Sequence, residues 1–547
     1  MMDQLFFSVF RNKYLFNKIV IHAFTDYIVI KNILQLDKQY DRLVTLNKLN
    51  IPVVYHILDI NYFHFYNTHK HKHLITHVIV SSYFYKYHLH LLKGDDDHQQ
   101  QQQQLQQTTI KPILFGISTT RESDPLIPAD ELPASIKYFK YTIVRPISKE
   151  YIPESVTSLY LGVTVDVGVI PNTVKTLVMY IDLPGLNPPP LVDFNIESLP
   201  KSLTSFSFHD CFFRAHSFNL EKMPPKLVYL NIKVFKGSLI GTSRTGSIKY
   251  LVFCSKSMSE IPSSVTYLYL DDAMWESSTP TPPSIQLPPF LSYFSYIKSV
   301  SRIAMPTIPK LLPPHLKSLA LNQCLFKDIT RDNCPPGVLY YKNVSDRKER
   351  SQPFIPPSAT NVNIFLSDKI DAYPIIPPSV TTLKIKCSPS LSKSLPRGFF
   401  PNNITTLTLC YDGKLSPGTI PFSVTKLKLQ YSKPIKVDVI PYSVKKLSLS
   451  SKKPVKPIII PTSVTTLGFE YQNQIYPGIQ IPTSIKTLKV ANPNIVNFPF
   501  HLFPSISTFC SGAPDSRRHR YFEEAYDSMT NFPKNIKIVK LTHKNRK

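Results

Sequence analysis

Histidine is the residue type whose spacing in this sequence could do chemistry. Nine of the sixteen histidines fall between His56 and His98, and three of them alternate with lysine in the run HKHKH at residues 69–73. On a β-strand this alternation would place three imidazoles on one face, where they could bind zinc or copper weakly. The intervening lysines would repel a cation, and no carboxylate or thiol lies nearby in the sequence. We therefore predict no metal site.

Motifs for catalysis are absent from the sequence. It contains no glycine-rich phosphate loop, no GxSxG, no HExxH and no kinase motif set. The cysteines have no histidine at a spacing that argues for nucleophilic catalysis. Proline is abundant and glycine scarce, with Pro 50 against Gly 15, so phosphate-cradling loops are disfavoured. The sequence predicts a protein that is not an enzyme and has no cofactor.

The net charge and the cysteine content indicate which partners and which cellular compartment suit the chain. Lys+Arg 63 against Asp+Glu 37 gives a net charge of +26 over 547 residues, which suits an acidic partner. The abundance of Lys, Asn, Ile, Tyr and Phe is also what an AT-rich genome produces, so binding and codon bias both remain open as the cause. Seven cysteines without a CxxC pair, and no apolar run of membrane-spanning length, predict a cytoplasmic or nuclear protein without a membrane span.

A phrase of about ten residues recurs in the C-terminal half. Examples are IPFSVTKLKL from Ile420 and IPYSVKKLSL from Ile440, and the spacing between copies is 20 to 23 residues. Weaker copies extend the array to about nineteen units over residues 125–547, with the best copies at 376–490. Aligned on proline, the anchors of the best copies are Pro378, Pro401, Pro421, Pro441, Pro461 and Pro482.

Each copy has a simple physical interpretation. The proline imposes a bend that leads into a strand, and the apolar-x-x-apolar-x-apolar pattern that follows is the core of a leucine-rich repeat. One such unit cannot bury its apolar side chains alone, so the copies must stack. The sequence predicts a leucine-rich-repeat-like solenoid with one parallel β-strand per repeat of about 20–22 residues, little helix and a short helical N-terminal cap.

The phrase I-P-x-S-V-x-x-L-x-L, with Pro417-Gly418 just ahead of the next Ile-Pro, resembles the FNIP repeat family, a short relative of leucine-rich repeats that is abundant in social amoebae. The resemblance covers about three quarters of the chain. Where the family has F-N-x-P-I/L, residues 431–435 read YSKPI, so this is a divergent copy. The resemblance implies a repeat scaffold that binds proteins.

The remaining segments differ in character. Residues 1–50 have apolar side chains at loosely helical spacing and are interpreted either as the cap of the solenoid or as an adaptor-binding segment. The second interpretation comes from the resemblance, because some FNIP relatives carry an F-box-like module that recruits a ubiquitin-ligase adaptor; the Leu-Pro start of an F-box is missing here. Residues 51–93 are expected to hold atypical repeats with a strand at His77–Val80, and 94–124 a disordered, low-complexity Gln-rich loop. A short helix is expected at Ser516–Met529.

The side chains that alternate with the buried ones define a candidate binding face. Across the six best repeats, the outward positions carry nine threonines, seven lysines and no acidic residue. Stacked lysines repel one another, and an anionic ligand would relieve that repulsion. Aromatic residues are missing from these positions, which argues against single-stranded nucleic acid. The predicted partner-binding residues are Thr382, Lys384, Thr406, Thr408, Lys426, Lys428, Lys445, Lys446, Lys486 and Lys489.

These observations predict a non-catalytic scaffold in which a concave, Thr/Lys-lined strand face binds a macromolecular partner, expected to be an acidic or phosphorylated protein. No specific nucleic acid is expected. The alternative is a ubiquitin-ligase substrate receptor, in which residues 1–50 hold the adaptor and the repeats hold the target.

Overall fold

The structure is a computed structural model of the chain. It describes residues 27–30, 33, 35–93, 112–143, 147–162, 167–181, 199–241, 246–254, 257–258, 261–271, 287–297, 312–322, 329–344, 354–368, 372–388, 391, 394–431, 435–450, 459–469, 481–490, 500–512 and 537–541. The chain divides into two compact units: unit 1 comprises Met1–Arg214 and Phe218–Val234, and unit 2 comprises Ala215–Ser217 and Phe235–Lys547.

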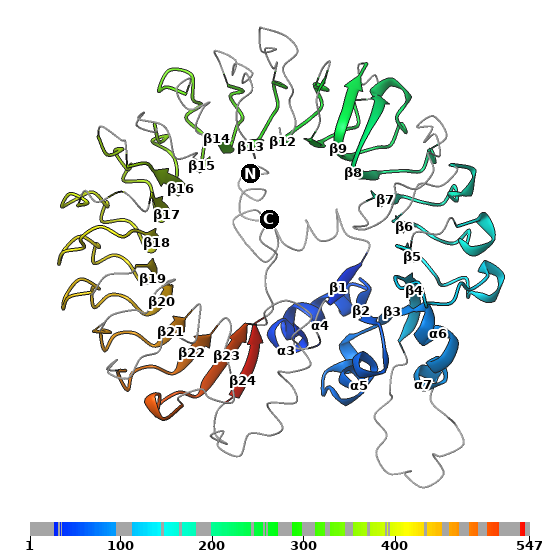
Figure 1. Ribbon diagram of the computed structural model, residues 1–547, viewed down its shortest axis with the longest axis horizontal. Coiled ribbons are helices and arrows are strands. Elements are labelled where there is room, and N and C mark those ends of the chain that lie inside the picture. Colours follow the sequence, from blue (N-terminus) through cyan, green and yellow to red (C-terminus); the bar gives the residue numbers. More distant parts are fainter. Residues whose placement is uncertain are drawn as a thin grey trace, which may run out of the picture. The chain divides into compact units, whose positions relative to one another are not determined.

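Unit 1 begins with strands that alternate with helices (Figure 1). The helices α4, α5 and α6 pack against the strands β2 to β4. Side chains cap two of the helices, since Asp59 accepts hydrogen bonds from the backbone of Asn61 and Tyr62, and Ser81 accepts one from Phe84. The elements are β1 (Ile28–Ile30), α3 (Gln35–Lys38), α4 (Tyr40–Lys48), β2 (Val53–Ile57), α5 (Ile60–Thr68), η1 (Lys72–Leu74), β3 (His77–Ser81), α6 (Ser82–His88) and α7 (His90–Lys93).

The later repeats of unit 1 replace the helices with short 3₁₀ turns. Strands β1 to β8 pair in chain order, and every pair is parallel. The elements are β4 (Ile113–Thr119), η3 (Ala129–Glu131), β5 (Tyr138–Tyr141), η4 (Lys149–Tyr151), β6 (Ser158–Leu161), η5 (Val167–Val169), β7 (Thr176–Ile181), β8 (Ser205–Asn219), η7 (Leu220–Lys222) and β9 (Tyr229–Ile240).

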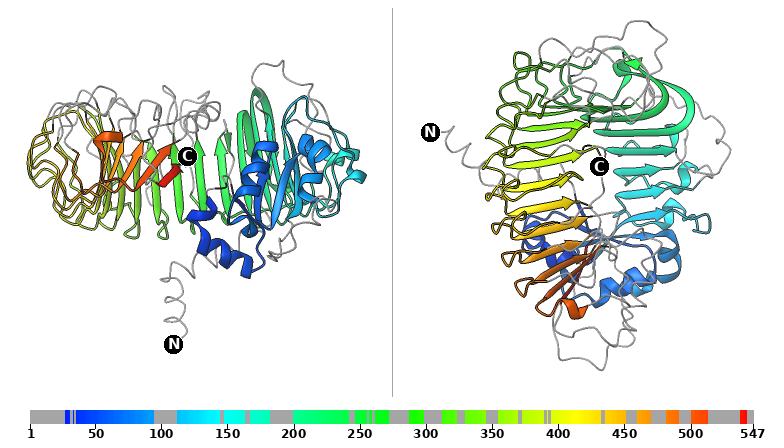
Figure 2. Two further views of the ribbon diagram at one scale, coloured as in Figure 1. Left: turned by 90° about the horizontal axis from the view of Figure 1, so that it is seen from below. Right: turned by 60° about the vertical axis from the view of Figure 1, so that its left-hand side comes forward.

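Unit 2 is a parallel ladder with one strand per repeat (Figure 2). Within this unit the strands line the inner side of a curve and the described turns lie on its outer side (Figure 1). The strands are β10 (Tyr250–Cys254), β11 (Ser257–Met258), β12 (Tyr267–Asp271), β13 (Tyr293–Ile297), β14 (Ser318–Asn322), β15 (Tyr340–Val344), β16 (Asn361–Leu366), β17 (Thr382–Cys387), β18 (Thr406–Cys410), β19 (Lys426–Gln430), β20 (Lys446–Ser450), β21 (Thr466–Phe469), β22 (Thr487–Val490), β23 (Thr508–Gly512) and β24 (Lys537–Leu541), with η10 (Phe500–Leu502) before β23.

The recurring phrase encodes a turn that is bonded to the repeat before it. In the turn that leads to β19, the carbonyl of Pro421 accepts a hydrogen bond from the amide of Val424 at 3.1 Å. The hydroxyl of Ser423 donates to the carbonyl of Ile404 in the preceding repeat at 2.8 Å. Val424, Leu427 and Leu429 are 0 %, 2 % and 1 % exposed, so the phrase supplies both the turn and the core.

The same serine bond recurs through both units. Equivalent hydroxyls donate to the preceding repeat at 2.7 to 3.0 Å from Ser135, Ser155, Ser202, Ser264, Ser358, Ser379, Ser443, Ser463 and Ser484. Gly418, at φ 80°, supplies the left-handed residue of the Pro-Gly turn that the amide of Thr419 closes onto the carbonyl of Ser416.

The predicted fold class is confirmed: the structure is a parallel, leucine-rich-repeat-like solenoid with little helix. Strands β5 to β10 and β12 to β24 each follow one of the predicted repeat anchors, and β3 confirms the strand expected at His77–Val80. Anchors predicted at proline pairs were misplaced by one residue, because the turn starts at the first proline of the pair: before β17 it starts at Pro377 rather than at Pro378. The turns before β9, β13, β14 and β16 likewise start at Pro224, Pro288, Pro313 and Pro356 rather than at the prolines that follow them.

Two expectations about the N-terminal third need correction. Residues 27–50 contain the strand β1 as well as helices, because the run Ile28–Ile30 pairs with β2. The loop expected over 94–124 is shorter at its C-terminal end, where Ile113–Thr119 form β4. Residues 1–26, the glutamines and Ser516–Met529 lie outside the described residues. Within the described residues, no helix is long and apolar enough to span a membrane.

The turn serines provide a test of what holds neighbouring repeats together. We expect Ser463→Ala to lower the free energy of unfolding by about 1 kcal/mol, because the carbonyl of Val444 loses its hydroxyl donor. Thr462→Ala, in the same turn but at an exposed position, is the matched control. Urea denaturation followed by circular dichroism measures both. Equal losses in the two variants would contradict the assigned role of the serine.

Candidate functional site

The strand face of unit 2 is defined by the side chains of β16 to β22 that alternate with the buried leucines. Consecutive strands pair without a register shift, so equivalent residues form columns along the stack. One column reads Asn361, Thr382, Thr406, Lys426, Lys446, Thr466, Thr487, and the next reads Asn363, Lys384, Thr408, Lys428, Ser448, Gly468, Lys489.

All ten predicted partner-binding residues lie on or at the start of this face. Eight lie within β17 to β22, and Lys445 and Lys486 immediately precede β20 and β22. Lys426, Lys428 and Lys446 are exposed, and Lys384 and Lys489 are half-buried. The structure therefore brings these side chains onto one surface; whether that surface binds a partner stays a prediction.

Another set of threonines on this side of the strands has a structural role. The hydroxyls of Thr405, Thr425 and Thr465 each donate to a backbone carbonyl of the preceding repeat at 3.3 Å. The acceptor carbonyl of Thr405 also receives the amides of Thr425 and Lys426. These threonines hold strands together, so part of the threonine enrichment seen in the sequence needs no ligand to explain it.

Lysines form a cationic cluster on the same face. Lys342 of β15 and Lys384 of β17 point to this side, on either side of Asn363. Burial lowers the pKa of Lys384, and the charges of Lys386, Lys428 and Lys342 lower it further. Burial and the charge of Lys386 likewise lower the pKa of Lys342.

No salt bridge within the described part of the chain involves these lysines. The cluster therefore carries repulsion that the described residues do not neutralise. Neither Lys342 nor Lys386 was predicted from the sequence as part of this face. Lys342 lies in a repeat before the six best ones, and Lys386 lies two residues beyond the last position taken from its repeat. Both alternate with apolar residues, in YYKNV and TLKIKC, and that alternation could have indicated that they share the face.

Tyrosines occupy the same face further along the stack, in repeats where no aromatic surface was expected. Tyr250, Tyr267 and Tyr293 stand in register on β10, β12 and β13. The rings of Tyr267 and Tyr293 are stacked, with centroids 4.0 Å apart and planes at 5°. The statement that aromatic residues are missing therefore holds for the six best repeats only.

The corresponding face in the first repeats of unit 1 is covered. Val54, Ile79, Phe115 and Tyr138 form a buried cluster there, against which Tyr27 and others pack. Burial, with the nearby charge of Lys140, lowers the pKa of His56 to about 4. A strand buried on both sides reads as a continuous apolar run, as in VVYHI and HVIV. On these first strands of unit 1 the face is therefore not open in the way that it is on β16 to β22.

The histidine run does not lie on a strand. His69 and His71 approach the carboxylate of Asp37 at 3.6 and 3.7 Å, and Lys70 approaches it at 3.5 Å. The carboxylate thus joins α3 to the segment before β3. Among the residues described, no three His, Cys, Asp or Glu side chains are placed to hold a metal ion.

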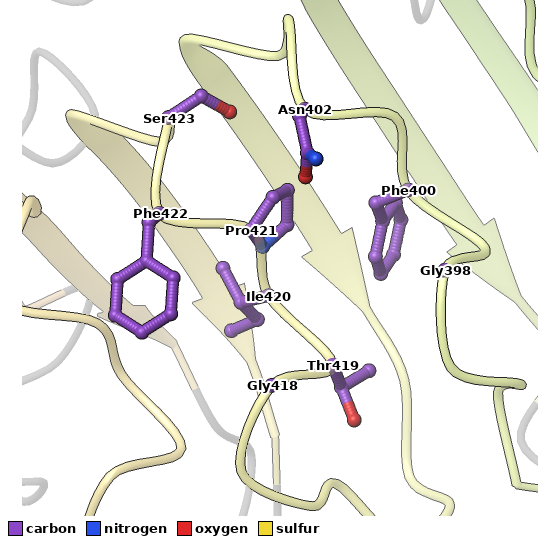
Figure 3. Close-up of a pocket in the computed structure, with 9 residues that line it drawn as sticks. All are labelled: Gly398, Phe400, Asn402, Gly418, Thr419, Ile420, Pro421, Phe422 and Ser423. Carbon is purple, nitrogen blue, oxygen red and sulfur yellow. The ribbon is translucent and has the colours of Figure 1, made fainter.

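Two half-buried cysteines and one cavity in the described part of unit 2 lack the features of a reactive site. Burial raises the pKa of the Cys387 thiol to about 12 and that of Cys334 to about 11, which disfavours the reactive thiolate. A cavity of about 250 Å³ lies between successive turns on the outer side of unit 2 (Figure 3). Its lining, from Gly398 to Ser423, includes Phe400, Asn402 and Phe422 but no titratable side chain.

The chain is similar to known repeat proteins. Residues 391–432 and 411–452 match the FNIP Repeat family. Among solved structures, the chain is similar to "The crystal structure of CroV588 a novel circular LRR protein structure", with 20 % identity and a TM-score of 0.46 over 80 % of this chain and 64 % of that chain. The chain thus spans less than two thirds of that neighbour. A comparison with curated proteins found no match.

The lysine columns predict a charge-dependent stability. Lys446 stands directly beside Lys426, and like charges on adjacent strands repel. We expect Lys446→Gln to raise the free energy of unfolding by a few tenths of a kcal/mol at low salt, and screening to remove this gain at about 0.5 M NaCl. Lys436→Gln, at an exposed turn position, is the control. A gain that persists at high salt would show that charge is not its cause.

Proposed function

We propose that this FNIP/LRR-like repeat protein is a non-catalytic interaction scaffold whose unit 2 strand face binds an anionic protein segment. The observation that carries the proposal is the set of lysines on the face of β17, β19, β20 and β22, together with the fact that no described face position from β16 to β22 is acidic. Repeat solenoids commonly serve as interaction scaffolds, because their stacked strands present an extended surface.

Electrostatics supports an anionic partner. Lys384 and Lys342 have lowered pKa values because they are partly buried and lie near other lysines. Bringing carboxylates or phosphates to the face would replace repulsion with attraction and raise the pKa values of these two lysines. Binding free energy of this kind is available in the free protein without any rearrangement of the strands.

The face offers two kinds of contact to such a segment. The lysines supply ammonium donors from four of the repeats, one from that of β17 and two each from those of β19, β20 and β22. They are Lys384, Lys426, Lys428, Lys445, Lys446, Lys486 and Lys489. The hydroxyls of Thr382, Thr406 and Thr408 add neutral donors between them. A segment that crosses the strands from β17 to β22 meets lysines on β17, β19, β20 and β22, so a run of acidic or phosphorylated residues fits better than a single charge.

The ubiquitin-ligase alternative receives no support from the residues described or from the comparisons. Residues 27–50 take part in the fold, since β1 pairs with β2 and Leu43 and Leu46 of α4 are buried. A deletion of residues 1–50 would therefore remove structural elements together with any adaptor site. A deletion of residues 1–26 separates the two effects better.

Charge reversal on the face tests the proposed function. We expect Lys426→Glu with Lys446→Glu to abolish capture of the partner from cell lysate, measured by affinity purification and quantitative mass spectrometry, because acidic side chains repel the anionic segment. The matched control is Lys414→Glu with Lys436→Glu, which makes the same charge change at exposed positions between strands.

Circular dichroism must show that both variants are folded. Loss of the same proteins from both variants would mean that net charge, rather than this face, attracts them. Retention of all proteins by the face variant would overturn the proposal.

A further inference from the structure

The tyrosines and the lysines of unit 2 lie on one face and meet at β15. Tyr250, Tyr267 and Tyr293 occupy the first column on β10, β12 and β13, and Tyr340 occupies it on β15. Lys342, two residues after Tyr340, begins the cationic part, which continues through Lys384. Along the stack the face therefore carries tyrosines on β10, β12, β13 and β15, and lysines on β15, β17, β19, β20 and β22. Among the tyrosine-bearing repeats, Lys249 and Lys317 stand immediately before β10 and β14.

The tyrosine rings form a column with one interruption. Tyr250 and Tyr267 have ring centroids 5.8 Å apart, and Tyr267 and Tyr293 are 4.0 Å apart. On β14 the position between Tyr293 and Tyr340 is Ser318, whose side chain is too small to fill the space of a ring. Two strand spacings of about 4.8 Å separate the flanking backbones, which is the separation at which two rings can sandwich a third planar group.

Tyr293 and Tyr340 are close enough to influence each other across Ser318. Burial raises the pKa of Tyr340, and Tyr293 contributes a smaller increase. Both side chains are half-buried, so part of each ring remains accessible. Beside Ser318 on the face, Ala320 stands next to Ser295 on β13, so the floor of this position is built from small side chains.

We propose, building on the proposed function, that the anionic segment bound by unit 2 is a bipartite peptide: an acidic run lies over the lysines of β17 to β20, and an aromatic residue of the same segment inserts between Tyr293 and Tyr340. From β14 to the lysines of β17 to β19 is three to five strand spacings, or about 14 to 24 Å. An extended chain covers this in about four to seven residues, which sets the distance between the aromatic residue and the acidic run.

The separation of the two chemistries favours a peptide over single-stranded nucleic acid. A nucleic acid brings a base and a phosphate with every nucleotide, so its binding surfaces combine stacking rings and cations at each step. Here the rings come first along the stack and most of the lysines follow. A peptide can carry an aromatic end and an acidic end, and it matches that order.

Synthetic peptides test the proposal with the full chain. The parent probe carries one Trp, five Gly/Ser residues and six Glu, with a fluorophore for anisotropy; a second peptide replaces Trp by Ala, and a third extends the spacer to fifteen residues. A version with the Glu run before the spacer and the Trp is also included, because the face does not define whether the chain of the bound peptide runs from β14 toward β20 or in the opposite direction. We expect Trp→Ala in the better-oriented peptide to weaken binding about two- to tenfold, the range of an aromatic pair, and the long spacer to lose most of that gain.

The variants are taken from the repeats themselves, so that each replacement already occurs at the same register in a neighbour. Tyr293→Ser copies Ser318, and Tyr340→Thr copies Thr382 two strands further along. Each variant should bind the Trp peptide only as tightly as it binds the Ala peptide, and its affinity for the Ala peptide should equal that of the unmodified protein. Tyr442→Thr copies Thr462 at an exposed turn position outside the face and should change nothing. Lys428→Ser, which copies Ser448, should weaken both peptides.

Each remaining outcome overturns a defined part of the argument. Equal binding of the Trp and Ala peptides, still weakened by Lys428→Ser, would refute the bipartite segment and leave the proposed function standing. Failure of every peptide to bind would remove both. Tighter binding of a twelve-nucleotide oligouridylate, lost in Tyr293→Ser, would replace the peptide with nucleic acid.

Discussion

The hydrogen bond from each turn serine to the preceding repeat is the interaction on which the rest of the structure depends. In the turn before β20, the proline carbonyl closes on Val444 and the hydroxyl of Ser443 reaches back to the carbonyl of Val424. The bond satisfies a carbonyl that would otherwise be half-buried without a partner. It also fixes where the next valine enters the core, so one short phrase sets both the turn and its placement on the repeat below.

This constraint forces equal residues into columns. Because the buried apolar positions repeat without a shift, whatever stands at a face position is placed beside its equivalent in the next repeat. Lysines at that position therefore accumulate charge, as with Lys426 and Lys446, and tyrosines stack, as with Tyr267 and Tyr293. The architecture converts a local sequence preference into an extended surface of one chemical kind.

Much of this could be predicted from the sequence, and the exceptions have physical causes. The prolines and the spacing of Val, Leu and Leu predicted the strands and the exposed lysines, because the positions of strands and lysines both follow from the alternation of buried and exposed residues within about five positions. Other features could be recognised only from the pairing of the strands in the structure. The tyrosine column and the membership of Lys342 and Lys386 in the cationic cluster become visible once the strands are aligned in register. The covered face around Val54 and Ile79 depends on residues distant in sequence, as does the contact of Asp37 with His69 and His71.

The fold itself does not require the chemistry found on the face. At the first face position the same register accepts Tyr293, Ser318, Tyr340, Asn361, Thr382 and Lys426 on otherwise equivalent strands, so packing of the core leaves this position free. Lysine beside lysine even works against stability. Under the proposed function, this arrangement has a purpose that the core does not supply, because a ligand that carries negative charge would turn the repulsion of the free protein into affinity.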